Sequence, residues 1–226
     1  ITYDELSIGQ SARLLRTLFW LLLWLMVVLL GPGGLLLFAD RLDPGLAAML
    51  GFAWLALACL SLPVVLQVQL RRVWYFPGTG VAVDEDELRG RLLAVNTLDA
   101  PVRVVERRRK LVVGWRHDEV QWCELLSRRG LSGLYELHLR FESRTRTVTL
   151  MDRRRPVQFL FCPEGVRTGR PRVVLPLVRL RPGRLGSMDQ YAATEPFQYD
   201  FLPREIKAPV LGTILQSGWN VRFSLF

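Results

Sequence analysis

The chain has 226 residues, of which half are hydrophobic, and a formal net charge of +9. It contains two histidines and three cysteines, and the cysteines lack the spacing of a zinc site or a dithiol motif. A Gly-rich phosphate loop, a nucleophile elbow and a metal-ligand signature are also missing from the sequence. Composition and motifs therefore do not support nucleotide chemistry or metal-dependent hydrolysis, and no metal or cofactor is expected.

Two long apolar runs lie near the start of the chain, at 18–39 and 46–70. A helix needs about 20 apolar residues to cross a bilayer core, so the two runs predict a transmembrane hairpin over 18–70 that follows a short segment at 1–17. A cleaved signal sequence is the less favoured alternative, because 37–39 is a poor cleavage site and a second run follows at once. Pro32 predicts a bend or an early end of the first span, and a new partner for the carbonyl that proline leaves unpaired.

The residues that flank the spans predict the orientation of the hairpin. The outer flanks are basic and the connecting loop is acidic, with Arg13, Arg16, Arg71 and Arg72 in the flanks and Asp40, Arg41 and Asp43 in the loop. Basic residues stay preferentially on the cytoplasmic side of a membrane, so both termini are predicted to be cytoplasmic. Trp74, just after the second span, has the position of an aromatic residue at the lipid headgroups.

The second span carries small residues near helical spacing, at Ala47, Gly51 and Ala58. Small residues let two helix backbones approach closely in lipid. We favour packing of these residues against the chain's own first span, and the alternative is a homo-oligomer or a partner helix.

The remaining residues, 71–226, hold 27 Lys and Arg against 17 Asp and Glu, a net charge of +10. We expect a cytoplasmic α+β domain over 71–180, with an antiparallel sheet and two or three helices. Its first half predicts a helix over 84–96, with Leu88, Leu92 and Val95 on its apolar side, and then a hairpin with a basic tip.

The same order of elements recurs in the second half of the domain. The pattern predicts a helix over 117–129, with Val120, Leu125 and Leu126 on its apolar side, and a hairpin over 135–150. Two helix-hairpin units indicate an internal repeat with weak residue identity. In the second hairpin, Tyr135, Leu137, Leu139 and Phe141 alternate with Glu136, His138, Arg140 and Glu142, so the first four face the core.

The last part of the chain is expected to form an extension, at 181–226. Further strands are predicted at 157–161 and 173–180, before an extended segment with scattered aromatic residues that lies over another surface. The final residues, 209–226, have the pattern of an amphipathic helix. Such a tail docks on its own domain, on the bilayer surface or in the groove of a partner.

Four residues are the candidates for catalysis, namely His117, Asp118, Cys123 and His138. A helix turns about 100° per residue, so it would not place His117 and Cys123 on one face. His138 lies on the polar side of a predicted strand, where a solvated or hydrogen-bonded role is favoured. Cys123 and Cys162 are far apart in sequence, and a reducing cytoplasm argues against a disulfide.

Basic clusters are the stronger functional feature. The candidates for contact with a lipid or a protein partner are Arg71, Arg72, Trp74, Arg107, Arg108, Arg109, Lys110, Arg153, Arg154 and Arg155. Each cation near an anionic bilayer surface contributes about 1 kcal/mol, whereas the alternative is a solvated face that maintains solubility. Nucleic acid is not expected as a partner, because the polar face of the second hairpin lacks an aromatic stacking platform.

Two spans followed by a basic, strand-rich domain resemble, in layout, the bacterial membrane proteins with pleckstrin-homology-like domains. The leading hypothesis is a non-enzymatic accessory or scaffold protein of the bacterial inner membrane, whose basic domain binds a partner complex or anionic lipid headgroups. The second hypothesis is a membrane-tethered enzyme acting on a lipid or a small membrane-delivered substrate. The third is a homo-oligomeric membrane assembly formed through the second span.

Overall fold

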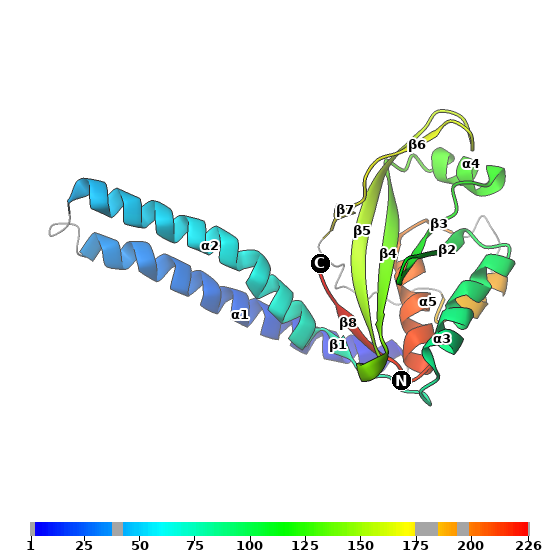
Figure 1. Cartoon of the computed structure of the whole chain (residues 1–226), viewed down its shortest axis with the longest axis horizontal. Helices are drawn as coiled ribbons and strands as arrows, with labels where there is room; N and C mark the ends of the chain where they lie inside the picture. Colours follow the sequence, from blue (N-terminus) through cyan, green and yellow to red (C-terminus); the bar gives the residue numbers. More distant parts are fainter. Residues whose placement is uncertain (1–2, 38–42, 175–184, 194–198, 226) are drawn as a thin grey trace. The chain divides into compact units, whose positions relative to one another are not determined.

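A computed structural model describes residues 3–37, 43–174, 185–193 and 199–225. The chain divides into two compact units, a helical hairpin that ends at Trp74 and a mixed α+β domain that begins at Tyr75 (Figure 1). The predicted combination of two long apolar helices and a sheet domain is therefore confirmed.

The hairpin consists of helices α1 (Tyr3–Leu37) and α2 (Pro44–Val73). The Asp43 carboxylate caps α2 by accepting hydrogen bonds from the backbone N–H groups of Gly45 and Leu46. Stretches within the two helices, Ala12–Gly34 and Pro44–Val73, are long and apolar enough to cross a membrane by length and composition. Helix α1 continues through Pro32 to Leu37, so of the two alternatives predicted at Pro32, a bend or an early end, the early end is wrong.

The two helices pack along one narrow seam. Its less exposed positions are spaced by three and four residues on each helix, Thr17, Leu21, Trp24, Val28 and Gly31 on α1 and Ala47, Gly51, Trp54, Ala58 and Ser61 on α2. This is the spacing of a two-helix coiled coil. Away from the seam both helices expose large apolar side chains, such as Leu15 at 70% and Phe52 at 75%.

Tryptophan indoles form the polar contacts across the seam. The Trp54 Nε1–H donates to the carbonyl oxygen of Val28 at 2.9 Å. That carbonyl is the one that Pro32 leaves unpaired, because a helical N–H bonds to the residue four positions earlier. Two further indoles donate to hydroxyl groups, Trp24 to Ser61 at 3.0 Å and Trp74 to Thr17 at 3.3 Å. The new carbonyl partner that Pro32 requires is thus Trp54.

The domain is built on one mixed sheet with the strand order β1-β8-β5-β4-β3-β2. Its strands are β1 (Tyr75–Phe76), β2 (Val102–Arg107), β3 (Lys110–Trp115), β4 (Gly133–Glu142), β5 (Thr147–Phe159) and β8 (Asn220–Phe223), and β6 (Val166–Thr168) and β7 (Arg172–Val173) pair with β5. Strands β2 to β5, which form the two predicted hairpins, are antiparallel as predicted. Strand β8, which was predicted to belong to a tail, joins β5 in parallel and makes the sheet mixed. The reason is that α5 crosses the sheet before β8, so β8 runs in the direction of β5.

The helices of the domain are α3 (Glu85–Leu93), α4 (Val120–Arg128) and α5 (Pro203–Gln216), with short 3₁₀ turns at Ala94–Thr97, Ser143–Thr145 and Met188–Ala193. Leu88, Leu92 and Val95 are buried as predicted. On α4, Leu126 is buried as predicted and Leu125 is half-buried, but Val120 is exposed. Trp122 and Cys123 are the other buried residues of this helix, and the prediction missed them.

The predicted order of helix, hairpin, helix and hairpin is found in the chain (Figure 1). The two helices nevertheless differ in surroundings, because α3 packs against α5 and β2, whereas α4 is joined by a disulfide to the turn after β5. The repeat is therefore one of element order, and the two units do not occupy equivalent places in the core.

The described C-terminal residues belong to the domain core, so they do not form the separate extension predicted over 181–226. Of the three alternatives for the tail, docking on its own domain is the one found. Helix α5 is buried from Glu205 to Leu211, and β8 lies between β1 and β5. Tyr191 and Tyr199 are also buried, as expected for a segment that lies over another surface. The predicted strand at 157–161 is the end of β5, and the predicted strand at 173–180 lies mostly outside the described residues.

The main sheet has an inner face, covered by α3 and α5, and an outer face (Figure 1). Leu137 and Leu139 are fully buried on the inner face, as their alternation predicted. His138 and Arg140 alternate with them and lie on the outer face.

Candidate functional site

Three basic side chains stand side by side on the outer face. Arg107 of β2 is the register partner of Lys110 of β3, and Lys110 is also the register partner of Arg140 of β4. Arg108 and Arg109 form the turn between β2 and β3, and Arg108 has a left-handed φ of 57°. Side chains at directly opposite positions lie about 5 Å apart, and like charges at such positions repel. The register therefore concentrates five cations at one end of β2, β3 and β4.

These five side chains line an open hollow of about 720 Å³, together with Val112 and His138. Val112 supplies an apolar floor and is only 9% exposed. Within the described ranges of the chain, none of the five cations is in ion-pair contact with a carboxylate. Other arginines of the domain do have carboxylate partners, among them Arg89, Arg91, Arg103, Arg116, Arg128, Arg155 and Arg222.

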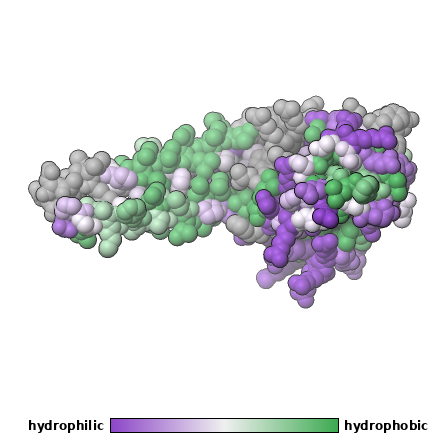
Figure 2. Space-filling model, turned by 90° about the horizontal axis from the view of Figure 1, so that it is seen from above, coloured by the Kyte–Doolittle hydropathy of each residue, from purple (hydrophilic) through white to green (hydrophobic). Residues whose placement is uncertain are grey.

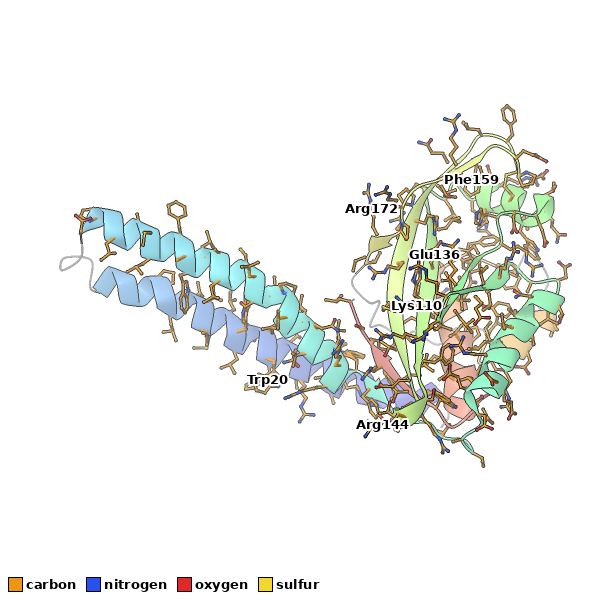
Figure 3. The ribbon with its side chains drawn as sticks, viewed as in Figure 1. Trp20, Lys110, Glu136, Arg144, Phe159 and Arg172 are labelled. Carbon is orange, nitrogen blue, oxygen red and sulfur yellow. A yellow bond between two sulfur atoms is a disulfide. The ribbon has the colours of Figure 1, made fainter. Side chains whose placement is uncertain are left out.

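Glu136, two residues before His138 on β4, forms an ion pair with Arg155. Its carboxylate lies 3.2 Å from Nε2 of His138 and accepts a hydrogen bond from Nε of Arg155 at 2.5 Å. Burial alone would raise the pKa of Glu136, but the hydrogen bonds to His138 and Arg155 and the charge of Arg155 outweigh it and lower this pKa to about 2. Glu136 is therefore ionised at neutral pH, and its charge is already engaged by His138 and Arg155. Lys110 and Glu136 are labelled on the sheet in Figure 3.

A second, smaller hollow of about 200 Å³ adjoins the first and shares Arg107 and Val112 with it. His117 and Asp118 line this second hollow. Asp118 forms an ion pair with Arg103, and the His117 Nδ1 lies 3.1 Å from the carbonyl oxygen of Trp115.

The structure separates the four candidate catalytic residues. His117 and Asp118 share one hollow, His138 lies in the other, and Cys123 is fully buried and bonded to Cys162. Among the residues that the structure describes, none of the four hydrogen-bonds to another of them. The arrangement of nucleophile, base and orienting group that acyl or group transfer requires is therefore not formed by this set.

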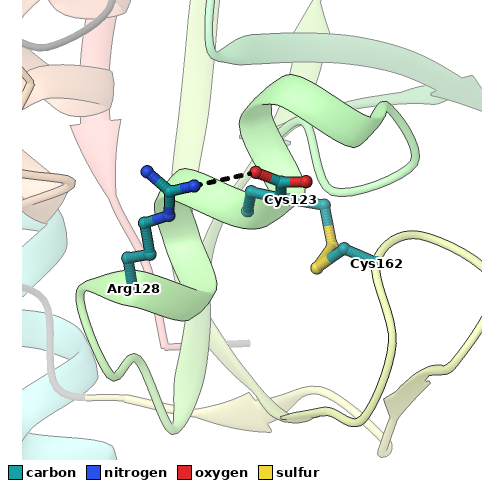
Figure 4. Close-up of a disulfide and its surroundings, with 4 residues drawn as sticks. Cys123, Arg128 and Cys162 are labelled. Atoms are coloured by element: carbon teal, nitrogen blue, oxygen red, sulfur yellow. Dashed lines mark hydrogen bonds and ion pairs between the residues drawn. A yellow bond between two sulfur atoms is a disulfide. The ribbon is translucent and has the colours of Figure 1, made fainter.

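The disulfide between Cys123 and Cys162 corrects the prediction that the cysteines stay unpaired. The two Cα atoms are 5.6 Å apart, although 39 residues separate them in sequence (Figure 4). Strand β5 is longer than expected, and the turn that follows it returns to α4. Sequence spacing could not reveal this long-range contact.

The remaining predicted contact residues fall in several places. Because side chains alternate along β5, Arg153 and Arg155 lie on the outer face, whereas Arg154 points the other way and donates to Ser132 at 3.2 Å. At the end of α2, Arg71 and Arg72 are exposed and Trp74 is buried. Trp74 is thus not a surface contact residue.

The predicted packing residues of the second helix lie on the seam toward α1. Ala58 is 8% exposed, and Ala47 and Gly51 are partly buried. A Cβ atom on Gly51 would meet no atom within 4 Å, so the seam has room at this position.

Arg140 is the residue of the basic hollow that sequence reasoning missed as a contact residue. Its place on the polar side of β4 could be predicted from alternation, but its neighbour Lys110 follows only from the pairing of β3 with β4. In the described ranges of the chain, no group of three or more His, Cys, Asp and Glu could hold a metal ion.

Comparison with known proteins identifies no relatives. No family model matches the chain, and neither a curated protein nor a solved structure is similar to it. The resemblance to proteins with pleckstrin-homology-like domains thus remains limited to the order of the spans and the basic domain. A functional conclusion therefore depends on the residues of the site.

Proposed function

We propose that this chain is a non-enzymatic protein of the bacterial inner membrane, anchored by α1 and α2, whose basic domain binds an anionic partner. The observation that carries the proposal is the row of cations at Arg107, Lys110 and Arg140, which has no carboxylate partner in the described chain. The anionic partner is a layer of lipid headgroups or the acidic surface of a partner complex.

The surface of the hairpin supports a membrane anchor. Both helices present apolar side chains outside the seam, and Figure 2 shows hydrophobic residues along the hairpin. Exposing this apolar surface to water is unfavourable, whereas contact with lipid tails avoids the unfavourable hydration of apolar groups. The indole of Trp54 also satisfies the Val28 carbonyl, as a bilayer requires of a helix interrupted by proline.

The basic flanks at Arg13, Arg16, Arg71 and Arg72 support cytoplasmic termini. A single residue, Trp74, connects the end of α2 to the start of β1, so the tether between anchor and domain is short. Residues 75–226 hold 25 Lys and Arg against 17 Asp and Glu, and a domain with this charge of +8 on such a tether is held near anionic headgroups. In a reducing cytoplasm, Cys123 and Cys162 would be a dithiol that forms the disulfide on oxidation.

The proposal can be tested with the full chain. We expect the protein to stay in membranes washed with alkaline carbonate and to dissolve in detergent. Reconstituted in zwitterionic nanodiscs, it should bind vesicles that contain phosphatidic acid and not vesicles of phosphatidylcholine alone, and about 0.5 M salt should weaken the binding because it shortens the Debye length.

Release by carbonate would contradict the membrane anchor. A protein that ignores anionic vesicles and also co-purifies with no partner would contradict the binding role.

A further inference from the structure

We propose that the hollow at the β2–β3 turn is a binding site for a phosphate-bearing ligand with two or more negative charges. Arg107, Lys110 and Arg140 form its wall, and Val112 forms its floor. This inference rests on the proposed function of the basic domain, and it adds the chemical class of the ligand and the residues that bind it.

The first argument is the cost of the arrangement without a ligand. Lys110 stands opposite a cation on each side, Arg107 on one strand and Arg140 on the other. Directly opposed like charges destabilise a sheet. Elsewhere on the same face, Arg103 contacts Asp118 and Arg155 contacts Glu136. The row of Arg107, Lys110 and Arg140 has no carboxylate partner among the described residues, whereas neighbouring arginines on the same face do. This is the pattern expected where an external anion neutralises the row.

The second argument is the chemistry of the lining. Four of its five cations are arginines, and a guanidinium group can bind two phosphate oxygens at once. Five positive charges match a ligand with several negative charges better than a single carboxylate. The volume of about 720 Å³ is that of a small-molecule site.

The third argument concerns the competing ligands. Nucleic acid normally stacks its bases on aromatic side chains, and the described lining of the hollow contains Val112 and His138 but no Phe, Tyr or Trp. The phosphate therefore belongs to a lipid headgroup or to a small soluble compound. Both sources present the same chemistry to Arg107, Lys110 and Arg140.

The test compares two variants with the same loss of charge, Lys110→Gln in the hollow and Arg167→Gln on β6. Arg167 lies away from the hollow. Lys110 is in register with Arg140, and Arg140 with Thr149 of β5, whereas Arg167 pairs with Gln158, which is nine residues further along β5. Arg167 is exposed and forms no ion pair within the described part of the chain. The full chain is held in phosphatidylcholine nanodiscs, and its unfolding is followed by tryptophan fluorescence.

Tripolyphosphate should raise the Tm of the wild-type domain, because a ligand stabilises the state that binds it. Lys110→Gln should raise the Tm without ligand by about 1–3 °C, because it removes two repulsions. The same variant should weaken binding about fivefold or more, which is the loss of a charge-assisted hydrogen bond. Arg167→Gln should leave binding within about twofold of wild type, because only diffuse charge is lost.

The source of the phosphate follows from comparing tripolyphosphate with vesicles containing phosphatidic acid, at equal accessible phosphate. Tighter binding to the vesicles, weakened by Lys110→Gln, assigns a lipid headgroup, and tighter binding to tripolyphosphate assigns a soluble ligand. Either result supports the site.

Equal weakening by Lys110→Gln and Arg167→Gln would overturn the site and leave the proposed function standing. Binding of a glutamate octapeptide as tight as that of tripolyphosphate would overturn the phosphate assignment, and so would tighter binding of a single-stranded oligonucleotide. A lower Tm of unliganded Lys110→Gln would refute the argument from repulsion. Failure of the wild-type chain to bind any anion would instead contradict the proposed function.

Discussion

At the scale of single residues, Asp152 shows what a buried charge requires in this domain. It is 2% exposed, and its two carboxylate oxygens accept from Nζ of Lys207 at 2.7 Å and from the hydroxyl of Tyr135 at 2.6 Å. Burial lowers the pKa of Lys207, and the charge of Asp152 opposes this effect. The three residues join β4, β5 and α5 within the core.

Replacing Lys207 tests this network. Lys207→Met removes the ammonium group that lies 2.7 Å from the buried Asp152 carboxylate and should lower the free energy of unfolding by about 3–5 kcal/mol. Tyr135→Phe removes one neutral donor and should lower it by about 1–3 kcal/mol. Denaturant unfolding of the full chain in detergent, followed by tryptophan fluorescence, measures both.

The double variant Lys207→Met with Asp152→Asn provides the control, because it also removes the stranded charge. It should recover part of the stability lost by Lys207→Met. A double variant less stable than Lys207→Met would show that the ion pair is not the source of the loss.

Glu136 predicts a dependence of stability on pH. Its pKa is about 2 in the folded chain against an ordinary value of 4.5. A depressed carboxyl pKa stabilises the fold above the ordinary value, and this contribution is lost as the pH falls from about 4.5 to about 2. The difference in unfolding free energy between wild type and Glu136→Gln should therefore shrink over this range in denaturant titrations. A difference that is constant from pH 7 to pH 2 would refute the role given to His138 and Arg155.

At the scale of elements, the hairpin depends on a match between small and large residues along its seam. A Cβ atom on Gly31 would lie 2.2 Å from the Trp54 ring, whereas one on Gly33 would meet nothing within 4 Å. Gly31 thus admits the indole that satisfies the Val28 carbonyl. Gly33 has no such contact, although both glycines belong to the same helix.

Only one of these two glycines should therefore tolerate alanine. Gly33→Ala should be neutral or stabilise the hairpin by up to about 1 kcal/mol, because alanine favours helix. Gly31→Ala should destabilise the hairpin, because Trp54 must move and its hydrogen bond is worth about 0.6–1.7 kcal/mol. The protection of the α1 and α2 backbone amides against hydrogen exchange in detergent measures the stability of the hairpin in each variant. Equal protection in the two variants would mean that Trp54 does not occupy the seam at Gly31.

At the scale of the whole molecule, the cysteines report the compartment of the domain. Cys59 is unpaired, and Cys123 and Cys162 form the disulfide. In the loop-entropy description, a bond spanning 39 residues stabilises a domain by up to about 4 kcal/mol. The bond persists only in an oxidising compartment, so under the proposed membrane anchor its state in cells depends on which side of the membrane the domain occupies.

Acid quenching of cells, followed by maleimide-polymer labelling in SDS, counts the free thiols. If both termini are cytoplasmic, we expect three labelled cysteines in untreated cells and one, Cys59, after oxidation with diamide. Labelling of one cysteine in untreated cells would place the domain in an oxidising compartment and reject the proposed orientation. A Cys162→Ser variant, with two labelled cysteines under every condition, is the control.

Local patterns in the sequence were sufficient to predict the features that depend on residues close together in the chain. The apolar runs determined the two long helices, because length and composition decide that property, and alternation determined the inner face of β4. The tip of the β2–β3 hairpin was also predictable, from two strand patterns around four basic residues.

Only the tertiary structure decided which distant residues meet. Three contacts join segments whose pairing cannot be recognised from neighbouring residues in the sequence. They are the pairing of β8 with β5, the disulfide between Cys123 and Cys162, and the alignment of Lys110 with Arg140. Strand register and chain return are set by the packing of the whole core. The sequence by itself therefore determined an apolar hairpin and an excess of positive charge. The fold decided that five of those charges gather in one hollow without a carboxylate partner among the described residues.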